Sequence, residues 1–259
     1  MEIFSFNPAT LFSFLLTLMR ISLVVFLLPF YGGETLPATV KACICLVLTL
    51  ALWPQLSFPG ELMPAHPWGI AVVLLKELVL GLLLGLSVAF IFAGIQTGGE
   101  IMGFQMGFTM VTLADPQSGA QVSITSHLLY MVALLIFLAL DGHLALLRGL
   151  AGSFALIPPG GLTVGGPLAG SVLELSAGMF SVAVQIAGPI IAALFMVELA
   201  LALMGRAAPQ MNLLTLGFPL KIAVGFFFIG MIFSIIALRM EDTIIQTGPL
   251  LDNLMRRGQ

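Results

Sequence analysis

Charged side chains are scarce in this chain. Only 8% of its 259 residues are charged, 9 Lys or Arg and 12 Asp or Glu, whereas soluble domains carry roughly 25%. Hydrophobic residues make up 59% of the chain, and its mean hydropathy is +1.14. This composition excludes an ordinary soluble domain and indicates an integral membrane protein. The net charge of −3, with no run of Lys or Arg, also excludes nucleic acid as a partner.

Patterns that bind metals or catalyse reactions are missing as well. The two cysteines, Cys43 and Cys45, would point about 200° apart on a helix, so we expect buried thiols rather than a disulfide. The three histidines form no HExxH motif and no Cys/His spacing, and there is no nucleotide-binding GxxxxGK[ST] loop. We therefore expect no enzymatic activity, no cofactor and no metal, and any energy for transport must come from partners.

Long apolar runs are what the chain does have. A helix needs about 20 apolar residues to cross some 30 Å of hydrocarbon, and about six stretches reach that length. The moderately polar stretch 96–123 either continues the third span or interrupts it. The sequence thus predicts an all-α, polytopic membrane protein of about six long, kinked helices arranged as hairpins, with a kink at Gly188-Pro189. The expected spans are residues 9–31, 38–57, 70–95, 124–147, 171–205 and 220–245.

Small residues recur at four-residue spacing within these runs. Gly81 with Gly85, and Gly94 with Gly98 and Gly99, form faces on which two helices can approach closely. We interpret them as helix-packing sites rather than as a cradle for phosphate.

A few charged residues interrupt the apolar runs. Charges at membrane depth usually face protein or water, and a single small bundle has little interior for them, so the sequence favours subunit partners or a hydrated channel. Two of them, Glu174 and Glu198, are 24 residues apart on one segment, about 36 Å on a straight helix, which is too far for a proton-carrying pair. The charged residues within or next to the expected spans are Arg20, Lys76, Glu77, Glu100, Glu174 and Glu198.

A stretch rich in Gly, Phe and Met follows the third run and leads to Asp115-Pro116. Glycine permits unusual backbone angles, methionine adapts its shape, and phenylalanine fills space with apolar area. Such a segment can seal a pore and still move, but the same residues also serve in ordinary helix packing, and composition alone does not decide. The candidate gating residues are Gly103, Phe104, Met106, Gly107, Phe108, Met110, Asp115 and Pro116.

The last connection carries the strongest local pattern. It lies between two strongly apolar runs and is rich in turn-forming residues. In the simplest interpretation it is a hairpin loop, in which Asn212 caps a helix and the side chain of Arg206 reaches toward the membrane surface. The residues of interest are Arg206, Pro209, Gln210, Met211, Asn212, Gly217, Pro219 and Lys221.

The Pro209-Gln210-Met211-Asn212 and Gly217-Phe218-Pro219-Leu220-Lys221 runs, together with Arg206, resemble the signature of the FliR family. FliR is a membrane protein of the flagellar type III export apparatus, and its counterpart in virulence secretion is SctT. The resemblance covers nearly the whole chain. Further matching positions follow in the family's order: Arg20 with Pro29, Glu77 with Gly81 and Gly85, Gly103 to Gly107, Asp115-Pro116, Gly142-His143, Ser153-Phe154 and Pro158-Pro159-Gly160.

The resemblance implies a multi-pass subunit of the bacterial inner membrane, in the flagellar basal body, in contact with membrane lipid. One copy is expected to join FliP and FliQ subunits in a helical export gate that passes unfolded flagellar proteins. Residues 1–169 are expected to resemble FliP, and residues 170–259 a FliQ-like helical hairpin. The rival interpretation is a secondary transporter of a small solute, acting alone or as a homo-oligomer.

The resemblance also implies roles for the two motifs. The segment at about residues 103–116 matches a loop that plugs the closed pore, with Phe104, Met106, Phe108 and Met110 as sealing side chains. The loop around residues 209–212 is expected to face the cytoplasm and to meet neighbouring gate subunits, including FlhB and FlhA.

Overall fold

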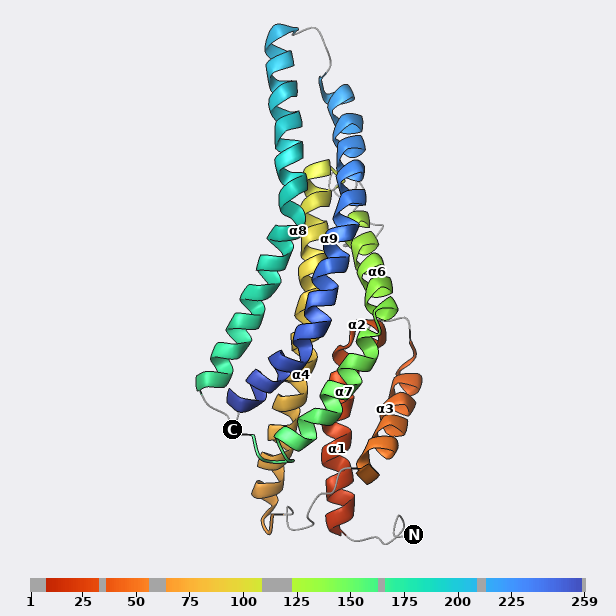
Figure 1. Ribbon diagram of the computed structural model, residues 1–259, viewed down its shortest axis with the longest axis vertical. Coiled ribbons are helices and arrows are strands. Elements are labelled where there is room, and N and C mark those ends of the chain that lie inside the picture. Colours follow the sequence, from red (N-terminus) through yellow and green to blue (C-terminus); the bar gives the residue numbers. More distant parts are fainter. Residues whose placement is uncertain are drawn as a thin grey trace. The chain divides into compact units, whose positions relative to one another are not determined.

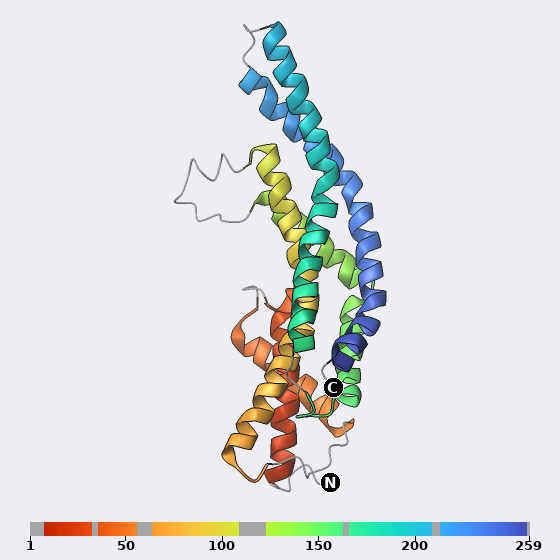
Figure 2. The same ribbon diagram turned by 90° about the vertical axis from the view of Figure 1, so that its left-hand side faces the viewer.

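The computed structural model describes residues 8–32, 36–55, 64–108, 123–162, 166–208 and 213–257. All regular structure within these ranges is helical, which confirms the all-α prediction (Figure 1, Figure 2). The elements are α1 (Pro8–Leu27), α2 (Pro29–Gly32), α3 (Ala38–Leu52), η1 (Trp53–Gln55), α4 (Pro67–Met106), α6 (Ile124–Ala139), α7 (Gly142–Leu156), α8 (Gly166–Ala207) and α9 (Leu213–Arg257).

Prolines mark where several helices begin. Pro8, Pro29 and Pro67 each occupy the first position of a helix, where the missing N–H is not needed and the fixed φ suits the helix. Pro189 is different, because α8 continues through it. Since proline has no N–H to donate, the carbonyl of Gln185, one turn earlier, lacks its usual helical donor.

The described residues contain fewer spans than the six or so expected. Within them, four helical segments are long and apolar enough to cross a membrane: Pro8–Leu27, Pro67–Met106, Ala169–Ala207 and Thr215–Glu241. The predicted second span is only the 15-residue α3, about 22 Å long. The predicted fourth span is interrupted between α6 and α7, and gives a fifth crossing only if the two helices count as one. Residues 96–106 continue the third helix rather than interrupting it.

The chain divides into two compact units. The first contains Met1–Phe90, Asp141–Leu175 and Thr243–Gln259, and the second contains Ile91–Leu140 and Ser176–Asp242. Helices α4, α8 and α9 therefore contribute to both. These two units are defined by packing. The boundary expected between residues 169 and 170 is defined by likeness to FliP and FliQ, and it stays a prediction.

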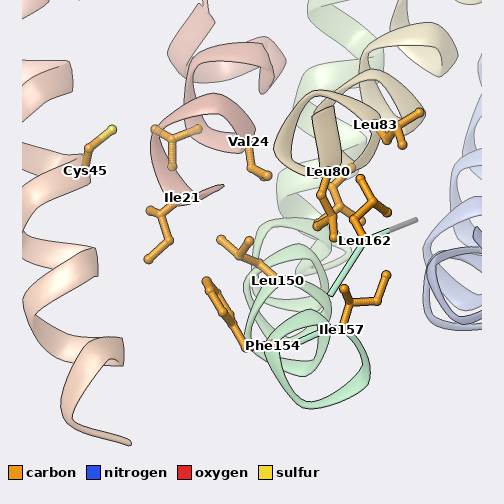
Figure 3. Packing of buried hydrophobic residues seen from close by; sticks show 11 residues of the cluster. Ile21, Val24, Cys45, Leu80, Leu83, Leu150, Phe154, Ile157 and Leu162 are labelled. Carbon is orange, nitrogen blue, oxygen red and sulfur yellow. The ribbon is translucent and has the colours of Figure 1, made fainter. Parts of the chain in front are cut away.

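The first unit has an apolar core made by four helices. Ile21 and Val24 of α1, Leu80 of α4 and Phe154 of α7 pack together, with Cys45 of α3 at one side (Figure 3). Cys45 is buried as expected, but Cys43 is exposed, and both are free thiols.

Glycines bring α1 and α4 close together within this unit. A Cβ placed on Gly81 would lie 3.1 Å from the carbonyl oxygen of Arg20, and one on Gly85 would lie 2.5 Å from Cδ1 of Leu27. Any larger residue would push the helices apart, so the predicted packing role of this pair is confirmed.

Glycines also bring helices close together in the second unit. A Cβ on Gly98 of α4 would lie 3.1 Å from the carbonyl oxygen of Ala183 on α8, and one on Gly99 would lie 2.5 Å from Cα of Ser126 on α6. The ring of Phe92 packs edge-on against Phe137, with centroids 5.5 Å apart. Within this unit, α8 and α9 lie side by side in both views (Figure 1, Figure 2).

Candidate functional site

A buried ion pair joins α1 to α4 in the first unit. Nε of Arg20 lies 2.7 Å from Oε2 of Glu77, and Nη2 of Arg20 lies 2.9 Å from Oε1. The guanidinium therefore binds the carboxylate with two parallel hydrogen bonds, the strongest geometry for this pair. Both side chains are fully buried.

The remaining polar atoms of the pair are satisfied by α7 and the turn after it. Arg20 donates to the carbonyl of Ile157 at 3.1 Å and to Oγ of Ser153 at 3.3 Å. Its guanidinium also lies 4.2 Å from the ring centroid of Phe154, within the range of a cation–π interaction. The N–H of Gly160 donates to Oε1 of Glu77 at 2.9 Å. One charged pair thus ties α1, α4 and α7 together.

Lys76 adds a second link to the same turn. Its Nζ donates to the carbonyl of Gly160 at 3.1 Å, so both backbone groups of Gly160 bind neighbouring side chains of α4. The backbone of Gly160 has a φ of +79°, which glycine adopts without strain.

This arrangement corrects one inference from the sequence. Arg20 and Glu77 need neither another subunit nor a hydrated channel, because the chain itself supplies every partner. Ser153 and Gly160 appeared in the sequence only as matching positions of a family, and no role was inferred for them. Their contacts join residues up to 133 positions apart, which no local sequence pattern reveals.

The other charges are more exposed. Nζ of Lys221 on α9 lies 2.5 Å from Oε1 of Glu198 on α8, and their side chains are 21% and 45% exposed. Glu100 and Glu174 are also exposed. Arg206 is exposed in the last turn of α8, where a positive charge interacts favourably with the helix dipole.

The Gly/Phe/Met stretch begins as helix rather than as loop. Gly103, Phe104 and Met106 form the last turn of α4. The N–H of Gly107 donates to the carbonyl of Phe104 at 3.1 Å, and that of Phe108 donates to Gly103 at 3.0 Å. With the φ of +88° at Gly107, these two bonds form the Schellman motif that ends many helices. Met110, Asp115 and Pro116 lie outside the described residues.

Side chains of this stretch differ in environment. Met106 is fully buried, whereas Phe104 is 70% exposed. The Phe108 ring packs edge-on against Phe226 of α9, with centroids 6.3 Å apart. Phe218 of α9 covers Gly107, where a Cβ would lie 2.7 Å from its Cε1.

The start of α6 is also fixed to α4. Oγ1 of Thr125 donates to the carbonyl of Gly99 at 2.8 Å, and Oγ of Ser126 donates to that of Gln96 at 3.0 Å. A Cβ on Gly103 would lie only 2.1 Å from Oγ of Ser123. Gly103, one of the candidate gating residues, is thus a point of close contact. The chain before residue 109 and the chain after residue 122 are therefore both packed against other helices of the second unit.

The last connection is shorter than the sequence suggested. Residues 209–212, which hold Pro209, Gln210, Met211 and Asn212, lie outside the described residues. Gly217, Pro219 and Lys221 belong to α9 and not to a loop. A Cβ on Gly217 would lie 3.3 Å from Cδ1 of Leu201, so this glycine lets α9 approach α8.

Comparison with known proteins gives consistent matches over most of the chain. The family model described as "Bacterial export proteins, family 1" matches residues 11–247. The flagellar biosynthetic protein FliR of Bacillus subtilis is 31% identical, with 94% of both chains covered. FliR of Escherichia coli is 30% identical over 85% of this chain and 84% of its own. The surface presentation of antigens protein SpaR of Salmonella typhimurium is 25% identical over 83% and 80%.

Proposed function

The chain belongs to the bacterial export proteins of family 1, and on this basis we propose that it is a subunit of the flagellar type III protein-export apparatus in the inner membrane. The observation that carries the proposal is the similarity to flagellar FliR proteins over 94% and 85% of the chain. The 25% identity to SpaR, a protein named for surface presentation of antigens, is lower than the identity to these two flagellar relatives.

The subunit acts within a larger assembly. Large apolar side chains are exposed along the second-unit parts of α8 and α9, among them Phe195, Leu203, Phe227 and Met231. Such a surface requires lipid or other apolar helices. Following the family resemblance, one copy joins FliP and FliQ subunits, and the loop at residues 209–212 meets FlhB and FlhA.

The transporter alternative is not favoured. None of the relatives named above is a solute transporter. A proton-coupled carrier also needs a buried carboxylate that is free to exchange protons, whereas both carboxylate oxygens of the buried Glu77 are held by Arg20 and Gly160. The subunit has no enzymatic activity of its own, and export draws its energy from partners.

Within the assembly, the segment from Gly103 to Pro116 forms the closed gate. Its helical part ends at Met106, so the sealing part begins at Gly107 and includes Phe108 and Met110. Gly107 supports this role, because it ends α4 at the point where the sealing part begins.

Copurification tests membership of the gate. An affinity tag on this chain, expressed with the FliP-like and FliQ-like proteins of the same genome, should isolate a complex of all three. Isolation as a homo-oligomer without the other two proteins would overturn the proposal.

A shortened segment tests the plug. Removing residues 109–116 should leave the complex intact and make cells that express it permeable to ions or small dyes. An intact complex with unchanged permeability contradicts the plug, whereas failed assembly indicates that the segment serves packing alone.

A further inference from the structure

Met106 occupies a notch in α9 that exists because residue 225 is glycine. A Cβ on Gly225 would lie 2.6 Å from both Sδ and Cε of Met106 and 2.8 Å from its Cγ. Real Cβ atoms essentially never approach another heavy atom this closely, so any other residue at 225 would require the side chain of Met106 to shift. Met106 is the last residue of α4 and is fully buried.

Two phenylalanines flank this notch. Gly225 and Phe226 follow Phe218 by seven and eight residues, so the three positions lie on one face of α9. Phe218 contacts Gly107, and Phe226 contacts Phe108. Residues 106–108, the last described residues of the Gly103–Pro116 segment, thus each meet one position of the same helix face.

The glycines of α9 do not all serve this purpose. A Cβ on Gly230 would have no neighbour within 4 Å, so Gly230 could carry a side chain. Gly225 is specific to the contact with Met106. These contacts hold the last residue of α4 and the two residues that follow it against α9.

We propose that Gly225 is a positioning residue for the gate. It leaves space for the side chain of Met106 and, with Phe218 and Phe226, holds the end of α4 from which the sealing segment starts. This inference rests on the proposed plug. Loosening the contact should release the start of the segment and allow leakage, although residues 109–116 are unchanged.

Four variants test the inference in cells that express the whole assembly. Gly225→Val inserts atoms into the notch, and Met106→Ala removes the side chain that fills it. Each should raise dye or ion entry on the order of tenfold, because a disturbed contact shifts the closed gate toward open states. Combining both changes should return entry toward the parent level, since valine at 225 fills the space left at 106. Gly230→Ala is the matched control and should behave as the parent.

A second measurement separates this inference from the plug itself. In the purified complex, hydrogen exchange of the amides of Gly107 and Phe108 should speed up in Gly225→Val and slow again in the double variant. If shortening the segment causes leakage but cells with Gly225→Val or Met106→Ala take up no more dye or ions than the parent, the positioning role is wrong. If exchange changes as expected but shortening causes no leakage, the contact stands and the plug is wrong. If the double variant leaks as much as the single ones, residues 106 and 225 are not coupled and the inference is overturned.

Discussion

Arg20 and Glu77 form a bidentate ion pair with no exposed surface, and the chain itself supplies the hydrogen-bond partners of their charged atoms. Taking two charges out of water costs several kcal/mol for each ion, which the attraction between them offsets only with good geometry and additional hydrogen bonds. Ser153, Ile157 and Gly160 supply those bonds. The pair therefore restricts how α1, α4 and α7 can pack against one another.

Replacing one partner of this pair should destabilise the first unit strongly. Arg20→Met or Glu77→Leu leaves the other charge buried and alone, and we expect a loss of about 3–5 kcal/mol in the free energy of unfolding. The double variant removes both charges and should be more stable than either single variant. Thermal unfolding of the purified complex measures the difference, and a double variant as unstable as the single ones would contradict this account.

The second ion pair should matter much less. Glu198 and Lys221 are partly exposed, and pairs that solvent can reach contribute about 0–1 kcal/mol. Glu198→Gln and Lys221→Met should each lower the unfolding temperature less than Glu77→Leu does. A loss equal to that of Glu77→Leu would show that this pair is enclosed by another subunit in the assembly.

Two glycine-to-alanine changes should have opposite effects. In Gly85→Ala the new methyl group would collide with Leu27, and overpacking of this kind costs about 1–3 kcal/mol. Gly152 lies within α7 with nothing near its Cβ position, so Gly152→Ala should stabilise the helix by up to about 1 kcal/mol. Unfolding temperatures of the two variants, measured side by side, test the prediction. A Gly85→Ala variant as stable as the parent would show that α1 moves aside easily.

Gly160→Ala should weaken the hydrogen bond that the backbone N–H of residue 160 donates to Glu77 of the buried pair. An alanine at a φ of +79° is strained by about 1–2 kcal/mol, and relief of that strain would pull the N–H away from Glu77. Gly170→Ala, at a helical position of α8 with open space around it, is the control. If the two variants unfold at the same temperature, the turn at Gly160 does not hold the carboxylate.

The fold class and the packing faces could be predicted from the sequence, whereas the pairing of charges could not. Apolar runs and glycine spacing are local patterns, and they correctly indicated helices and the close contacts at Gly81, Gly85, Gly98 and Gly99. The count of spans was too high for the described residues because the mostly apolar, 15-residue α3 and an interrupted pair, α6 and α7, look like spans when composition alone is counted.

The candidate site shows the same limit. Arg20 and Glu77 were recognised as unusual, but their partnership depends on helices 57 residues apart in the sequence. Gly103 and Gly107 were both candidate gating residues, yet Gly103 is a packing glycine and Gly107 is the one with positive φ. Only the contacts of each glycine distinguish these two uses.

The wide separation of the partners of Arg20 has a consequence for how the protein is made. Ribosomes add roughly 5–20 residues per second, and the last partner of Arg20, Ile157, is 137 positions after it in the sequence. The guanidinium therefore exists for several seconds or more before its carboxylate and its turn have been synthesised. The contacts that join α1 to α4 and α7 form only after residue 157 has been added to the chain.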